Sequence, residues 1–235
     1  VASAISWLSS ALSVIPVASP VHADRTCANY WVFGDGSRTC QSEAAPPTCG
    51  IGADGSDQPI DPSLLNSLEV CPTSDSSSCA TTAAGAGAAD TDFIIYVSSI
   101  ETSACAGGTL AYAASCVMDQ YDRPVMGLAN FCPSSLSVAA ADWQEQYSTA
   151  VHELLHALGF SSSSWALFRY DDGTPRTARD EWGLPAEVET MCTDGSTRTE
   201  RAASSNTIAV AAERGTYTNR MVCMYVRMYV RTYVR

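Results

Sequence analysis

Lysine is absent from this chain of 235 residues, and its 13 basic residues are therefore all arginine. Acidic residues number 25, which leaves a formal net charge of −12. Because nucleic-acid-binding proteins rely on lysine and arginine to neutralise phosphates, this charge argues against binding to DNA or RNA. The chain also lacks an apolar run of the roughly 18 residues that a membrane-spanning helix needs.

Cysteine pairs with the metal-binding spacings C-x-x-C or C-x4-C are lacking too, although the chain has 10 cysteines. Most of them lie before residue 133. A dense and even set of cysteines without metal-ligand spacing is typical of disulfides made in an oxidising compartment. We therefore expect an extracellular or cell-surface protein.

Hydrophobic patterning predicts several elements. Residues 1–15 have apolar side chains at helical spacing with serines opposite, which favours an amphipathic helix over a signal peptide. Strands are expected at residues 92–97, 109–117 and 124–131. A helix is expected from about residue 137 to 158.

Gly159 is well placed to end that helix. Residues 81–89 have the small-residue composition of a flexible connector. Further along, the sequence permits short helices around residues 185–190 and 205–213.

The predicted helix contains the pattern H-E-x-x-H, formed by His152, Glu153 and His156. Residues four apart in a helix differ by about 40° in rotation and about 6 Å in rise, so both imidazoles leave one face. Two nitrogen ligands favour zinc, and Glu153 would take a proton from a zinc-activated water that attacks a peptide carbonyl. The alternative is a pair of ordinary surface histidines on an amphipathic helix.

A catalytic zinc site normally has three protein ligands and a water. The remaining histidine, His22, is far away in sequence, and an ordinary polar role is favoured for it. Glu181, Glu187 and Glu189 are other options, because one class of zinc peptidase takes its third ligand from a downstream glutamate. Solvated carboxylates are nevertheless the commoner case.

Four segments together resemble leishmanolysin-type metallopeptidases, and the likeness covers most of residues 1–213. They are V-H-E-L-L-H-A-L-G-F (151–160), T-D-F-I-I-Y-V (91–97), A-Y-A-A-S-C (111–116) and R-P-V-M-G-L-A-N-F (123–131). The resemblance implies a metzincin, a zinc endopeptidase that is secreted or surface-anchored and acts on polypeptide substrates. It implies an α+β fold in which a mixed sheet packs on the active-site helix, here with Cys-rich loops.

By the same resemblance, His152 and His156 are zinc ligands and Glu153 is the catalytic base. Gly159 matches the glycine at which the chain turns beneath the zinc. Residues 124–131 resemble the edge strand along which an extended substrate aligns. Cys49 and Cys116 resemble family cysteines, which suggests that they pair.

The chain also departs from the family. Compact metzincins have a third histidine where this chain has Ser162, and leishmanolysins have one after a long insertion, followed by a methionine turn. No histidine follows His156. The resemblance fades near Met221, and Cys223 is the one plausible substitute ligand in the tail.

We therefore expect three regions. Residues 1–160 would be the N-terminal part of a metzincin-like catalytic domain, 161–220 an insertion or the start of a following subdomain, and 221–235 a low-complexity tail. The first interpretation is an incomplete zinc endopeptidase. The alternative is a non-catalytic, disulfide-rich secreted module for binding or adhesion that derives from such a peptidase.

The tail breaks with the rest of the chain. Residues 224–235 repeat the pattern M-Y-V-R with a single change, and residues 214–235 hold five arginines and no acid. A basic amphipathic end can touch a membrane surface. An abrupt four-residue repeat also suits a sequence artefact, which is the favoured interpretation. Membrane association is expected only through this tail or through parts outside the chain.

Overall fold

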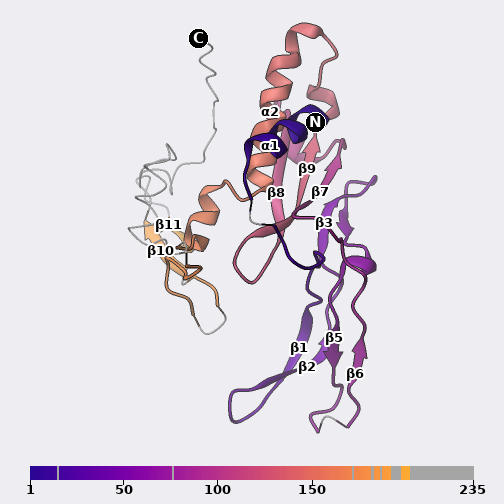
Figure 1. Cartoon of the computed structure of the whole chain (residues 1–235), viewed down its shortest axis with the longest axis vertical. Coiled ribbons are helices and arrows are strands. Elements are labelled where there is room, and N and C mark those ends of the chain that lie inside the picture. The colour runs from indigo at the N-terminus through magenta and orange to yellow at the C-terminus, as the bar shows by residue number, and fades with distance from the viewer. Residues whose placement is uncertain are drawn as a thin grey trace. The chain divides into compact units, whose positions relative to one another are not determined.

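The structure, a computed structural model, describes residues 1–14, 16–75, 77–170, 172–180, 183–185, 187–191 and 197–201. The chain divides into two compact units, residues 1–159 and 160–235. The first contains the two α-helices of the described residues, α1 (Ala2–Ala11) and α2 (Trp143–Ala157), and is drawn from indigo to salmon in Figure 1.

The strands of the first unit form a central sheet and three hairpins. The hairpins are β1–β2 (Cys27–Val32, Arg38–Glu43), β3–β4 (Thr48–Ile51, Asp57–Pro59) and β5–β6 (Leu68–Val70, Ala80–Thr82). The sheet consists of β7 (Ile94–Ser98), β8 (Ala111–Met118) and β9 (Pro124–Phe131). Short 3-10 helices span Pro62–Leu64, Ser103–Cys105, Pro133–Ser135 and Ala140–Asp142.

The central sheet is mixed, and its strand order is β7-β9-β8. Strand β9 runs parallel to β7 and antiparallel to β8. The expected α+β combination of a mixed sheet with helices is confirmed. The expectation that residues 124–131 form an edge strand is wrong, because β9 lies between its two partners. Six of its eight residues are buried, which is typical of a strand covered on both faces.

Both helices pack on one face of this sheet. Leu8 of α1 and Leu154 of α2 share a buried cluster with Ala129 and Phe131 of β9. Each helix is shorter than the sequence pattern predicts. After α1 the chain is extended at Leu12, ahead of Pro16, which disfavours helical backbone in the residue before it.

Helix α2 begins at Trp143 instead of near residue 137, because the residues before it take another conformation. The side chain of Gln146 accepts a hydrogen bond from the backbone N–H of Ser137 at 3.2 Å and donates to its carbonyl at 2.8 Å. These bonds hold the preceding loop against the first turn of the helix. The loop therefore leads into α2 through the 3-10 turn Ala140–Asp142 instead of extending the helix.

The small-residue stretch 81–89 is held in place, so its prediction as a flexible connector is wrong. Gly85 donates its N–H to Leu65 and Gly87 donates to Ser63, at 2.9 and 2.8 Å. A Cβ on Gly85 would overlap the backbone of Ser63. Small residues are therefore needed here for close backbone approach, not for flexibility.

Four disulfides staple the first unit: Cys27–Cys40, Cys49–Cys116, Cys71–Cys79 and Cys105–Cys132. The pairing of Cys49 with Cys116 is confirmed, and it ties β3 to β8 across 67 residues of sequence. Closing a loop of this length stabilises a fold by about 4 kcal/mol in the chain-entropy account. Cys192 and Cys223 lie outside the described residues.

In the second unit the described residues form a 3-10 helix, Ser162–Leu167, and the hairpin β10–β11 (Glu187–Met191, Thr197–Arg201). The short helix expected near residues 185–190 is therefore wrong, because cross-strand pairing with residues 197–201 takes precedence over a weak local helical tendency. The other expected helix, at 205–213, and the tail lie outside the described residues. In the part of the chain that the structure describes, no helix is both long and apolar enough to cross a bilayer.

The close approach of α2 to the sheet at Gly127 yields a prediction. A Cβ on Gly127 would lie 2.8 Å from Phe93, 2.9 Å from the carbonyl of Ala114 and 3.1 Å from the Cβ of Ala157. We expect Gly127→Ala to lower the free energy of unfolding by about 2 kcal/mol through overpacking. Urea denaturation with the disulfides intact measures this.

Gly34→Ala is the matched control, because no atom lies within 4 Å of a Cβ at that position. It should change stability by less than about 1 kcal/mol. Equal stability of the Gly127→Ala variant and the wild type would show that the helix and sheet do not meet as closely as described.

Candidate metal centre

Helix α2 carries the three residues of the H-E-x-x-H motif. Its 15 residues include neither glycine nor proline, and it ends at Ala157. Gly159 follows with a φ of +90° and donates its N–H to the carbonyl of His156 at 3.0 Å. The prediction that Gly159 ends the helix is confirmed. A Cβ there would also lie 2.8 Å from the ring of Pro124, so the turn is packed against the start of β9.

The two histidines lie together on one face of α2. Their Nε2 atoms are 3.0 Å apart, and the rings meet edge to face with centroids 4.6 Å apart. Two nitrogens that each bond a tetrahedral zinc at about 2.05 Å are about 3.3 Å apart. The observed separation therefore fits two corners of such a site after a small adjustment of the rings.

Glu153 lies beside this pair in a more protected position. Its side chain is 13% exposed, against 26% for His152, and its Oε1 is 4.0 Å from the Nε2 of His152. The backbone N–H of Ala113 in β8 donates a hydrogen bond to the carboxylate. Burial nevertheless dominates and raises the pKa of Glu153 to about 7.

The histidines are affected by burial as well. Desolvation lowers the pKa of His152, and the nearby charge of His156 lowers it further. A neutral imidazole is the form that binds a metal ion. The environment of His152 thus favours the ligand form.

No described histidine, cysteine or carboxylate completes a group of three with His152 and His156. The one group of three found in the described residues is Glu69, Cys71 and Cys79, and its two cysteines are joined in a disulfide. Its sulfurs are therefore not available to a metal.

The other candidate ligands lie in other parts of the chain. The ring nitrogens of His22 lie 3.0 Å from the carbonyls of Pro20 and Gly85. Glu187 and Glu189 lie in β10, within the second unit. Glu181 and Cys223 lie outside the described residues.

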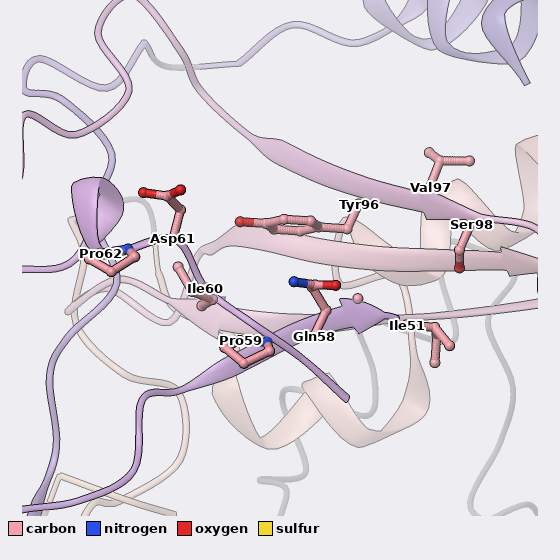
Figure 2. Close-up of a pocket in the computed structure, with 10 residues that line it drawn as sticks. Ile51, Gln58, Pro59, Ile60, Asp61, Pro62, Tyr96, Val97 and Ser98 are labelled. Atoms are coloured by element: carbon pink, nitrogen blue, oxygen red, sulfur yellow. The ribbon is translucent and has the colours of Figure 1, made fainter. Parts of the chain in front are cut away.

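Sequence reasoning missed two features of the first unit, one at the motif and one apart from it. The first is the hydrogen bond from the backbone N–H of Ala113 to Glu153. A pattern of side chains cannot predict it, because every residue type except proline has this donor. The second is a cavity of about 570 Å³ among β3, β4 and β7, shown in Figure 2. Tyr96 and Asp61 line it, and none of the three motif residues does.

The burial of Glu153 predicts a pH-dependent stability for metal-free protein. Its carboxyl ionises near 4.5 when unfolded but near 7 when folded, so the folded state holds the proton longer. Wild-type stability should therefore fall as the pH rises from about 4.5 to about 7 and change no further from this group above that range. The full loss would be about 3 kcal/mol.

Glu153→Gln lacks this titration. We expect the variant to gain stability relative to the wild type across that interval, in urea denaturation with a chelator present. A difference between the two proteins that stays constant from pH 4.5 to 8 would contradict the assigned burial.

Comparison with known proteins places this geometry in a family. The family model for leishmanolysin matches residues 66–179, which include the whole of α2. A leishmanolysin-like peptidase of Caenorhabditis elegans is 36% identical over 191 residues, which are 79% of this chain and 28% of that protein. A leishmanolysin-like peptidase of Drosophila melanogaster is 50% identical over 97 residues, 40% of this chain and 14% of that protein.

A further relative is a ciliated left-right organizer metallopeptidase of Xenopus laevis. It is 43% identical over 84 residues, which are 35% of this chain and 12% of that protein. The chain thus spans little more than a quarter of the length of the C. elegans relative. The expected resemblance is confirmed, and the chain belongs to the leishmanolysin family of metallopeptidases.

Proposed function

We propose that this chain carries two of the zinc ligands and the catalytic base of a zinc-dependent endopeptidase. The observation that carries the proposal is the geometry on α2, where two Nε2 atoms lie 3.0 Å apart beside a buried carboxylate. Imidazole ligands suit zinc, and the family supplies the reaction class. His152 and His156 would hold the metal.

Each of the three side chains has a separate task. Zinc, when bound, polarises the scissile carbonyl and lowers the pKa of its water to about 7. Glu153 accepts the proton of the attacking water and passes it to the leaving amine.

We propose that the substrate aligns along β8, in place of the expected strand at 124–131. Among the described residues β8 pairs with β9 alone, so its other edge carries unpaired backbone groups. Ala113 on this strand already donates an N–H to Glu153. An extended polypeptide that pairs with this edge would place a peptide bond next to the base, in the manner of strand addition.

The metal centre is incomplete in the described residues, since His152 and His156 supply only two protein ligands. We propose that a version of the protein whose sequence continues in the family's pattern past residue 220 supplies the third ligand. The four disulfides support an extracellular or cell-surface location, because such bonds persist in oxidising compartments.

One observation favours a second candidate function. Without a third described ligand, the same fold can serve as a non-catalytic, disulfide-stapled secreted module for binding or adhesion. Zinc stoichiometry and peptidase activity separate the two candidates. The endopeptidase requires bound zinc and cleaves peptides, whereas the binding module requires no zinc and cleaves none.

Ligand count predicts weak zinc binding by the 235-residue chain. A site with two protein ligands must spend part of its binding energy on ordering other partners. We expect competition with a chelator to show weak binding, and a version that continues in the family's pattern past residue 220 to bind tightly. The arginines of the tail repel a dication. Cys223 is therefore the residue of the tail to test as a substitute for the third zinc ligand.

The control for this measurement is Cys223→Ser. Tight one-to-one binding by both the 235-residue chain and this variant would show that an unidentified ligand completes the site. Weak binding that disappears in the variant would identify Cys223 as a contributor.

The role of Glu153 is tested in the longer version. Glu153→Gln removes the base but neither imidazole, so it should keep zinc within about threefold of wild-type affinity and lose at least about a hundredfold in peptidase activity. Glu145→Gln is the matched control, because Glu145 is exposed in the first turn of the same helix. Activity of the Glu153→Gln variant at the level of that control would refute the role of Glu153.

A further inference from the structure

His22 lies on an extended segment that is held between two other parts of the first unit. Val21 exchanges backbone hydrogen bonds with Ala88, at 2.9 and 3.1 Å, and Ala23 donates its N–H to Leu64 at 2.8 Å. Val21 and Ala23 are buried in a second cluster with Val125 and Met126 of β9. The segment around His22 thus fastens the N-terminal part of the chain to the sheet.

The imidazole of His22 has a carbonyl oxygen at each of its nitrogens. Nδ1 is 3.0 Å from the oxygen of Pro20, and Nε2 is 3.0 Å from the oxygen of Gly85. A carbonyl can only accept a hydrogen bond, and a neutral imidazole has a single N–H. In the neutral ring, one nitrogen lone pair must therefore face an oxygen lone pair. In the protonated ring, both nitrogens donate.

The ring has little freedom to avoid this conflict. It lies directly on Gly87, where a Cβ would overlap its Cε1 atom and lie 2.6 Å from its Nε2. Gly87 has a φ of +70°, which side-chain-bearing residues rarely adopt. The glycine at position 87 therefore leaves the space that the ring of His22 occupies.

Carboxylates do not explain the arrangement. Asp24 on the same segment accepts a hydrogen bond from Asn66, and Asp61 accepts one from the N–H of Ser63. Asp90 follows the segment that pairs with Val21. In the described part of the chain, none of these carboxylates lies within 4.0 Å of a His22 nitrogen. The partners of the ring are the two carbonyls.

We propose that His22 is a pH-operated clamp, in which protonation of the ring makes it donate to the carbonyls of both Pro20 and Gly85. The clamp is tight in acidic surroundings, where segment 20–23 and segment 85–88 are joined through the charged ring. At alkaline pH one of the two bonds is lost. This inference does not depend on the metal centre, because it uses none of its residues.

Hydrogen exchange of the full chain tests the clamp. The protection factors of the Val21 and Ala88 amides should fall about fivefold between pH 5.5 and pH 8 in the wild type, the size expected for the net loss of one hydrogen bond. In His22→Gln they should change with pH only as much as an amide far from residue 22 does. The amide of Cys132, which donates to Leu110 in another part of the unit, is the internal control. Equal pH dependence in the wild type and the variant would overturn the proposal.

A second measurement avoids reliance on that variant. The double variant His152→Gln, His156→Gln leaves His22 as the sole histidine, so its ring signals need no assignment. At pH 5.5 both ring N–H protons should be visible by NMR and protected from exchange with water. Rapid exchange of either proton at this pH would show that the corresponding carbonyl is not its acceptor, and the clamp would be excluded.

Discussion

The close packing of α2 on the central sheet is the constraint on which the rest of the molecule depends. Gly127 on β9 lets the helix approach until Ala157 lies directly over the strand. Leu154, on the same helix, completes the buried cluster between helices and sheet. The same approach brings α2 next to β8, where the Ala113 amide meets Glu153. Helix packing and site geometry are therefore set by one contact.

That contact also determines the chemistry available to the motif. Packing against β8 leaves Glu153 largely shielded from water, which raises the pKa of its carboxyl to about 7, and the single bond from Ala113 is too little to offset the desolvation. His152 stays more open than the glutamate, as a metal ligand near a substrate must. The stapled hairpins extend away from this centre, as Figure 1 shows, and their disulfides secure loops with little core of their own.

The elements with strong periodic or chemical signals could be predicted from the sequence. The strand at 124–131, the helix around His152 and its end at Gly159 all follow from local rules, and the H-E-x-x-H spacing places both imidazoles on one face. Features that depend on contacts between distant parts of the sequence could not be predicted in this way. The central place of β9 depends on pairing on both edges, the order of residues 81–89 depends on backbone contacts with residues 63–65, and a backbone amide such as that of Ala113 leaves no mark in a side-chain pattern.

X-ray absorption spectroscopy of the zinc-loaded chain tests the central claim most directly, because it reports which atoms bind the metal. The account predicts two imidazole ligands at about 2.0 Å, with the remaining positions taken by oxygen, and no sulfur shell at about 2.3 Å. The double variant His152→Gln, His156→Gln should lose the imidazole signal. A metal shell without imidazole in the wild type, or an imidazole signal that survives in the double variant, would contradict the assignment of α2 as the metal-binding helix.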